Sequence, residues 1–316
     1  MYTLRLIFSA LVIMAFRPVL QAQAPQQSNV HIGLIYPLST NGIHAAAYSN
    51  HFSLHGIAGV SRAETGVALA GFALIVKDSA SGLQISGFAN LIGNKARGLS
   101  LAGFGNICRD SSGVQAAGFI NKAGNVRFQA AGFINVAKKV STVQIAGFIN
   151  IADSCEYPIG LVNFIRNGEK AIGISTDETL TTLASFRSGS RKLYGIIGMG
   201  YNGKSGKDLY AWEAGLGAHL RLAPVFRINT ELVTTGLTDI NNMKRGSSFR
   251  QTLRILPALR LGRHVEVFAG PSFNYADTKK GVGDGLVTHY LWSQPTSGGR
   301  LQGLHFGVTG GISIIL

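Results

Sequence analysis

A short unit of glycine, phenylalanine and asparagine recurs through the first half of the chain and constrains its fold more than any other feature. The units begin at Gly71, Gly87, Gly103, Gly118, Gly132, Gly147 and Gly160, at spacings of 16, 16, 15, 14, 15 and 13 residues. A period of this length is typical of an architecture built from one repeated structural unit. In each unit, aliphatic residues alternate with amides, alanine and phenylalanine, which predicts β-strands with two unlike faces.

Two arrangements satisfy this repeat, and the sequence leaves both open. In the favoured one, each unit is a single strand of an antiparallel outer-membrane barrel, with aliphatic residues toward lipid and amides toward the lumen. In the alternative, each unit is one coil of a parallel β-solenoid, followed by an eight-stranded barrel. Uniform turn lengths favour the solenoid. The lack of a linker after the repeats favours one continuous barrel over residues 29–316.

The C-terminal half alternates aliphatic residues on one strand face with polar and charged residues on the other. Six strands follow Lys192, and residues 171–176 and 181–188 can complete the eight that a small membrane barrel needs. Eight charged residues fall on the face predicted to line the lumen: Glu213, Arg221, Arg227, Glu231, Arg250, Arg254, Arg260 and Glu266. They predict either an ion-pair network that fills the lumen or an anion-favouring pore.

Long and short connections alternate between these strands, as they do in outer-membrane barrels. The segments around residues 202–209, 237–247 and 277–301 are the longer ones and are expected to face outward. Six aromatic residues near these loops predict a girdle at the outer membrane interface: Tyr201, Tyr210, Trp212, Tyr275, Tyr290 and Trp292.

The first 22 residues have the pattern of a secretory signal peptide. Arg5 precedes the apolar run 6–16, and cleavage is expected after Ala22. We therefore expect a signal peptide over 1–22, a β-repeat region over 23–168 and outer-membrane barrel strands over 169–316. Only 14% of the residues are charged, whereas soluble domains have about a quarter. The expected location is the bacterial outer membrane, with membrane lipid as partner and an external ligand or surface partner left unidentified.

The repeat Val143-Gln144-Ile145-Ala146-Gly147-Phe148-Ile149-Asn150 resembles the Gly-Leu-Gln-Ile-Gly-Leu-Val-Asn surface repeat of bacterial envelope proteins. The resemblance covers residues 66–165 approximately. It implies an envelope or surface protein without enzymatic activity, and the family brings no catalytic residues. The functions left open are a passive pore, a structural role at the surface, and a surface adhesin that carries a solenoid.

Three patterns suggest chemistry, and each has a simpler structural interpretation. The segment 198–205 matches a phosphate-binding loop, but strand-like residues follow it where such a loop needs a helix, so a P-loop enzyme is a remote alternative. His44, His51 and His55 lie close together without carboxylate or thiol ligands, so no metal is expected. Cys108 and Cys155 are three repeats apart and are expected to stay unbridged. No cofactor or nucleic-acid partner is expected.

Overall fold

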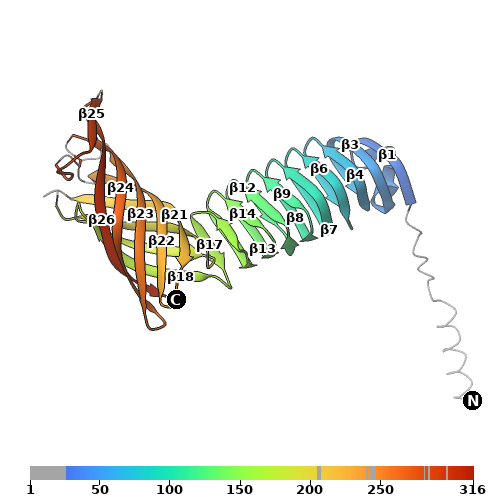
Figure 1. Cartoon of the computed structure of the whole chain (residues 1–316). Helices are drawn as coiled ribbons and strands as arrows, with labels where there is room; N and C mark the ends of the chain where they lie inside the picture. Colours follow the sequence, from blue (N-terminus) through green and yellow to red (C-terminus); the bar gives the residue numbers. More distant parts are fainter. Residues whose placement is uncertain are drawn as a thin grey trace, which may run out of the picture.

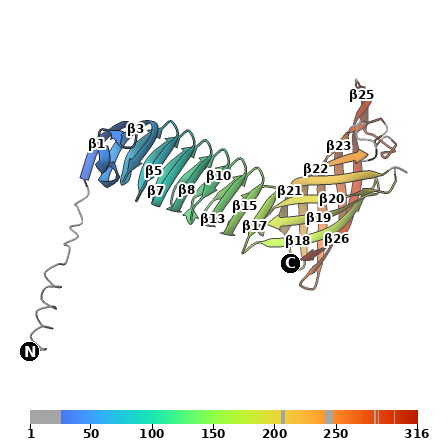
Figure 2. The same cartoon turned by 180° about the vertical axis from the view of Figure 1, so that it is seen from behind.

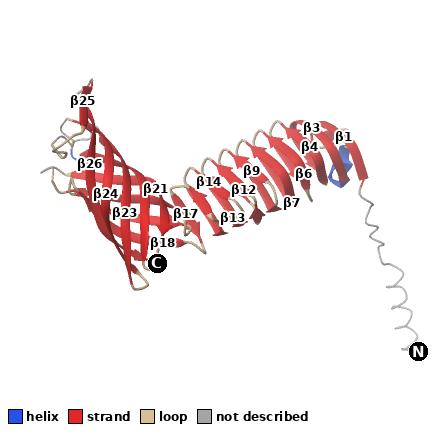
Figure 3. Ribbon diagram, viewed as in Figure 1, coloured by secondary structure: helices blue, strands red, loops and turns tan. Residues whose placement is uncertain are grey.

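The computed structural model describes residues 26–204, 208–239, 241, 247–280, 282–283, 285–296 and 298–316. The predicted signal peptide lies outside the described residues. The described chain is almost entirely β-strand and forms two bodies, a solenoid over residues 26–165 and a barrel over residues 169–315 (Figures 1 and 3). Within the described residues, no helix has the length and apolar character needed to cross a bilayer.

The solenoid is a stack of small coils joined by parallel strand pairing. One of its faces, here called the Gln face, contains β4 (Ala63–Ala70), β6 (Ala80–Ser86), the end of β7 (Ala89–Ala102), β9 (Val114–Ala117), β12 (Phe128–Ala131), β14 (Val143–Ala146) and β16 (Tyr157–Ile159). The other, the Asn face, contains β5 (Ala73–Val76), the start of β7, β8 (Gly105–Ser111), β10 (Ile120–Lys122), β13 (Ile134–Val140), β15 (Ile149–Ser154) and β17 (Val162–Ile165). The short strand β11 (Asn125–Val126) pairs with the end of β13.

Each coil bends from the Gln face to the Asn face at its Gly-Phe step. A Cβ atom built on Gly118 would lie 2.2 Å from the carbonyl oxygen of Gly103 in the preceding coil. Glycine is therefore required for the coils to approach each other at this corner. The phenylalanine that follows each glycine points outward, and successive rings stack from Phe72 to Phe148 with centroids 4.7–5.3 Å apart.

The interior of the solenoid contains a row of buried asparagines. The side-chain amide of each donates to the side-chain oxygen of the next, over 2.8–3.1 Å, through Asn90, Asn106, Asn121, Asn135, Asn150 and Asn163. From Asn90 to Asn150, each amide also donates to a backbone carbonyl oxygen of the next coil on the Gln face, as Asn121 does to Ala130. These bonds satisfy polar groups that would otherwise be costly to bury.

The N-terminal coil consists of β1 (Gln26–Ile35), β2 (Leu38–Ser39), the 3-10 helix η1 (Gly42–Ala47) and β3 (Tyr48–Ser61). β1 pairs in parallel with β3, and β3 pairs with β4 and β5. In a regular strand His51 and His55 would share a face, but a register shift between Asn50 and Phe52 leaves His51 exposed while His55 is buried. His44 is also exposed.

The barrel has eight antiparallel strands, β18 (Glu169–Asp177), β19 (Thr181–Gly189), β20 (Leu193–Asn202), β21 (Leu209–Arg221), β22 (Phe226–Asp239), β23 (Ser247–Leu261), β24 (Val265–Lys279) and β26 (Arg300–Ile315). β18 pairs with β26 and closes the sheet. The short strand β25 (Trp292–Thr296) extends the edge of β26 beyond the barrel (Figure 1).

The prediction of an all-β chain is confirmed. Of the two arrangements left open, the solenoid followed by an eight-stranded barrel is the one present. The favoured continuous barrel is wrong, because the repeat strands pair in parallel, each with the equivalent strand of the next coil. An antiparallel barrel would have required neighbouring repeats to run in opposite directions.

Candidate functional site

The barrel wall is apolar on the outside along all eight strands. Exposed outward-facing side chains include Ile174 of β18, Met199 of β20, Leu232 of β22 and Ile312 of β26. No Asp, Glu, Lys or Arg is exposed within the middle of the described barrel strands. A water-soluble barrel buries its apolar side chains and exposes its polar ones, so this wall has the reverse arrangement.

The centre of the barrel interior holds a buried network of ion pairs. Arg254 lies 2.6 Å from a carboxylate oxygen of Glu213 and 3.4 Å from one of Glu231. Arg187 makes a second contact with Glu231 at 2.8 Å, and the Tyr194 hydroxyl donates to the same carboxylate at 3.0 Å. Opposite charges at these distances offset part of the cost of burial in a low-dielectric interior.

A second network occupies the end of the barrel nearest the solenoid. Arg227 lies between Glu169, at 2.5 Å, and Glu266, at 2.7 Å. Arg260 contacts Glu169 at 2.5 Å. Arg221 also contacts Glu169, at 3.2 Å, but its side chain is 42% exposed and lies at the rim. The structure thus brings most of the predicted lumen charges together and places Arg221 at the edge.

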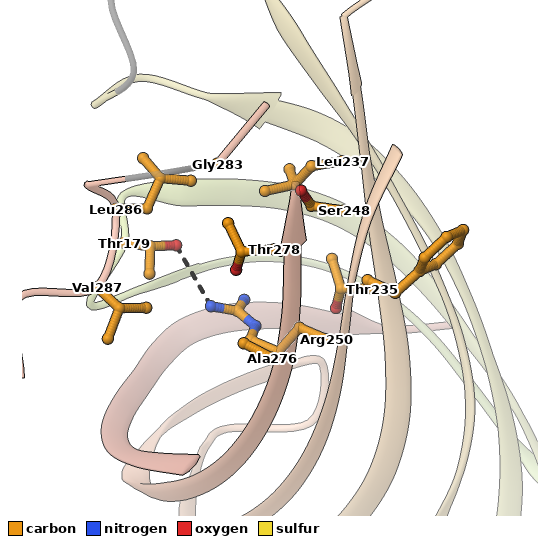
Figure 4. A pocket seen from close by; sticks show the side chains of 11 residues that line it. Thr179, Thr235, Leu237, Ser248, Arg250, Ala276, Thr278, Gly283, Leu286 and Val287 are labelled. Atoms are coloured by element: carbon orange, nitrogen blue, oxygen red, sulfur yellow. Dashed lines mark hydrogen bonds between the residues drawn. The ribbon is translucent and has the colours of Figure 1, made fainter. Parts of the chain in front are cut away.

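The long-loop end of the barrel contains the last predicted charge, Arg250. Its guanidinium pairs with Asp177 and donates to the Thr179 hydroxyl at 3.4 Å (Figure 4). Above it, the buried residues Val282 and Leu286 of the loop after β24 cover the opening. The remaining pocket there is about 30 Å³, and the pocket between the charged networks is about 10 Å³. These volumes hold on the order of one or two water molecules, so side chains fill most of the described interior at both places.

Glu169, Asp177 and Arg187 are interior residues that the sequence analysis did not single out. Arg187 could have been found, because Leu183, Ser185 and Arg187 alternate with Thr182, Ala184 and Phe186 along a segment already expected to be a strand. Glu169 and Asp177 mark the two ends of β18 and fall outside the predicted strand 171–176. Alternation alone gives no information there.

Five of the six predicted interface aromatics lie on the outer wall. Tyr201 and Tyr210 contact each other edge to face at 5.9 Å, and Trp212 contacts Phe249 at 6.2 Å. Trp212 also covers Gly236, whose Cβ would lie 2.3 Å from the indole nitrogen. Tyr275 faces outward on β24, and Trp292 on β25 pairs with Leu304 of the same outer face.

Tyr290 differs from this expectation. It is half-buried, and its ring meets the ring of buried His305 edge to face at 5.9 Å. A Cβ on the inward-facing Gly303 would lie 2.4 Å from the same tyrosine ring. Its loop turns back over the barrel mouth, so Tyr290 helps to cover the interior instead of facing outward.

The segment that matches a phosphate-binding loop has the wrong local structure for one. Residues 198–202 belong to β20, and β21 follows the loop where a helix would be required. Among the described residues, no group of three or more His, Cys, Asp or Glu side chains is arranged to hold a metal ion. Cys108 and Cys155 are buried free thiols.

The last solenoid coil packs directly against the barrel (Figure 2). The Asn163 side chain donates to the Ser188 carbonyl oxygen at 3.3 Å, and the Ser188 hydroxyl accepts the Asn163 backbone N–H at 3.0 Å. A Cβ on Gly195 would lie 2.2 Å from the carbonyl oxygens of Gly160 and Leu161. The asparagine row therefore ends on a barrel strand, and close backbone contact fixes the two bodies together.

Neither a protein-family model nor a curated protein matches this chain. One solved structure, described as "De novo design of transmembrane beta-barrels", is similar at 14% identity, with a TM-score of 0.27. The match covers 47% of this chain and 93% of that chain. A similarity of this size does not bear on function.

Proposed function

We propose that the chain is a non-enzymatic outer-membrane protein whose barrel spans the bilayer and anchors the solenoid. One observation carries this proposal: a closed eight-stranded barrel has apolar residues on its wall and ion pairs in its interior. Hydrocarbon solvates the wall, and strand closure leaves no unpaired backbone edge within the membrane.

The connections indicate the orientation. The turns 190–192, 222–225 and 262–264 are short and lie at the end of the barrel where β18 begins and β26 ends. The longer connections 203–208, 240–246 and 280–299 join strands at the opposite end, where the turn 178–180 is the one short connection. Outer-membrane barrels have their short turns on the periplasmic side. The solenoid joins the barrel at β18, so it lies on the periplasmic side.

This orientation distinguishes the functions that the sequence left open. A surface adhesin needs the solenoid on the long-loop side, where it is not attached. A passive pore needs a continuous aqueous lumen, but each described interior pocket holds on the order of one or two water molecules. An anchor for a periplasmic solenoid is consistent with both features.

The direct test is the mobility of the membrane-extracted chain in SDS gels, with and without heating. A closed barrel should migrate faster before heating, resist extraction by carbonate and produce no conductance steps in planar bilayers. Leu232→Arg places a charge on the exposed wall and should reduce the folded band, because such a charge costs about 2–4 kcal/mol near the bilayer centre. Thr288→Arg, in a long loop, is the control. Release by carbonate with no mobility shift would contradict the proposal.

A further inference from the structure

The solenoid has an exposed apolar surface that no other part of the described chain covers. The stacked phenylalanines Phe72, Phe88, Phe104, Phe119 and Phe133 are 39–51% exposed. Beside them on the Asn face, Leu91, Ile107, Ile151 and Phe164 are 37–42% exposed. A contiguous apolar surface that runs along several coils marks an interaction site in a folded protein.

The junction with the barrel shows which way the Asn face points. Its last exposed residue, Phe164, contacts Phe186 on the outer wall of β19 with ring centroids 6.3 Å apart. The apolar surface of the Asn face is therefore continuous with the wall that we assign to the bilayer. On the Gln face, the last exposed residue is Tyr157, which contacts Lys192 in the short polar turn beyond the barrel end. The Asn face thus turns toward the membrane and the Gln face away from it.

Basic side chains border the apolar surface of the Asn face. Lys122 lies among the exposed residues of this face. Lys77 and Arg166 directly follow β5 and β17, and Arg109 and Lys138 occupy the corresponding exposed positions in the second halves of β8 and β13. Asp153 is the one acidic residue at the corresponding described positions. Apolar side chains flanked by cations are suited to a surface of acyl chains covered by anionic headgroups.

We propose that the Asn face and its phenylalanine row form a peripheral binding surface for an anionic lipid bilayer. The solenoid would then lie along the leaflet from which the barrel emerges, with its basic margin at the headgroups. This inference rests on the membrane barrel proposed above, and the test below separates the two.

The solenoid provides a matched pair of reporter positions. Ile151 on the Asn face and Ile145 on the Gln face belong to the same coil and are 37% and 38% exposed. Each is replaced by cysteine in the full-length chain and labelled with the environment-sensitive fluorophore NBD. Burial raises the pKa of the native Cys108 and Cys155 thiols to about 11, which leaves little reactive thiolate, and the unsubstituted chain is the labelling blank.

The labelled proteins are reconstituted into phosphatidylglycerol-containing vesicles and into phosphatidylcholine vesicles. We expect the emission of the Ile151→Cys label to shift to the blue and rise several-fold in the anionic vesicles, while the Ile145→Cys label stays in a water-like environment. Lys122→Glu should weaken the Ile151→Cys response. Arg97→Glu makes the same charge change on the Gln face and should have no effect.

A third label, at Leu232→Cys on the barrel wall, reports insertion independently. Lipid-like emission at Leu232→Cys with equally water-like emission at Ile151→Cys and Ile145→Cys would overturn the binding surface and leave the barrel proposal intact. Water-like emission at Leu232→Cys would overturn the barrel itself. A response at Ile151→Cys that depends on protein concentration and not on lipid charge would show self-association and would also contradict the proposal.

Discussion

One buried arginine compensates the charge of two buried carboxylates inside the barrel. Arg254 is 1% exposed and separates the carboxylates of Glu213 and Glu231. Removing one partner of a buried ion pair destabilises a fold more than replacing both partners with apolar residues, because the remaining charge stays buried without compensation. The barrel interior should therefore be sensitive to single changes at its arginines.

Arg254→Met keeps a long side chain but leaves Glu213 facing Glu231 without the cation between them. We expect the barrel to lose about 3–5 kcal/mol of stability, measured by urea unfolding in detergent micelles. Arg263 lies in an exposed short turn, and Arg263→Met should change stability by less than about 0.5 kcal/mol. Equal unfolding midpoints for the two variants would show that the interior network does not stabilise the barrel.

The N-terminal coil contains a buried cluster whose charge depends on pH. His31 contacts Ser39 at 2.9 Å and Asn50 at 3.2 Å, and the His31 and His55 rings meet at 4.5 Å. Burial, together with His31, lowers the pKa of His55 to about 4. Burial raises the pKa of Glu64, which accepts hydrogen bonds from Asn50 and Ser53.

These pKa changes have opposite effects on stability. The folded coil favours neutral His55, so this contribution is complete above pH 6.5 and is lost as the pH falls toward 4. A change from 6.5 to about 4 corresponds to about 3 kcal/mol at most. The folded coil favours protonated Glu64, so its contribution increases as the pH falls below the raised pKa.

We expect His55 to make the largest contribution between pH 7 and pH 5, because its ordinary pKa of 6.5 lies inside this range, whereas the ordinary value of Glu64, 4.5, lies below it. Burial also lowers the pKa of His31, which acts in the same direction as His55. Hydrogen exchange of the β1 and β3 amides, corrected for intrinsic rates, should show easier opening at pH 5. His55→Gln should remove most of this pH dependence, and His51→Gln, at an exposed position of the same strand, should keep it. Unchanged protection at pH 5 in the native chain would contradict the assignment.

At the scale of the structural elements, the solenoid depends on its glycine corners. A Cβ at Gly71, Gly87, Gly103, Gly118, Gly132 or Gly147 would lie 2.0–2.2 Å from a backbone carbonyl oxygen of the preceding coil. Backbone atoms cannot move away without breaking the parallel pairing on both sides. Such a clash affects the stacking of two coils and not only one residue.

Gly118→Ala should therefore open the stack between neighbouring coils and cost at least about 2–3 kcal/mol. Amide exchange in β10 and β13 should increase, while exchange in the barrel strands stays unchanged. A Cβ on Gly203, in a barrel loop, would meet nothing closer than 3.9 Å, so Gly203→Ala is a suitable control. Wild-type protection in β10 and β13 of the glycine variant would contradict the close-packed corner.

The elements also show what the sequence could and could not predict. Alternation identified the barrel strands and the polar interior, because a strand in a closed sheet has one face inside and one outside. Alternation has the same period in parallel and antiparallel sheets, so it could not give strand direction. The alternation from Val143 to Ala152 predicts one continuous strand, yet the chain bends at Gly147 and Phe148 into β14 and β15. The Phe148 ring stacks on Phe133 of the preceding coil.

The partners in the long-range ion pairs could not be predicted from the sequence, for another reason. Arg187 and Glu231 are 44 residues apart, and Arg260 and Glu169 are 91 apart. Their contact depends on the register of several strands and on the closure between β18 and β26. Inward-facing charge could be predicted residue by residue, but the pairing of these charges follows only from the closed barrel.

At the scale of the whole molecule, a filled barrel and a rigidly attached solenoid act as one unit. Hydrogen bonds between Asn163 and Ser188, and the contact of Gly195 with the last coil, leave little freedom at the junction. The barrel then determines both the depth and the direction of the solenoid. In the proposed arrangement, the membrane-spanning barrel holds the solenoid on the side of the short turns.

The most direct test is cysteine accessibility in cells that export the chain to their outer membrane. Thr288→Cys lies in a long loop, and Ile145→Cys lies on the Gln face of the solenoid. A membrane-impermeant maleimide should label Thr288→Cys on intact cells and Ile145→Cys only after the outer membrane is permeabilised. Labelling of Ile145→Cys on intact cells, with Thr288→Cys protected until permeabilisation, would contradict the account.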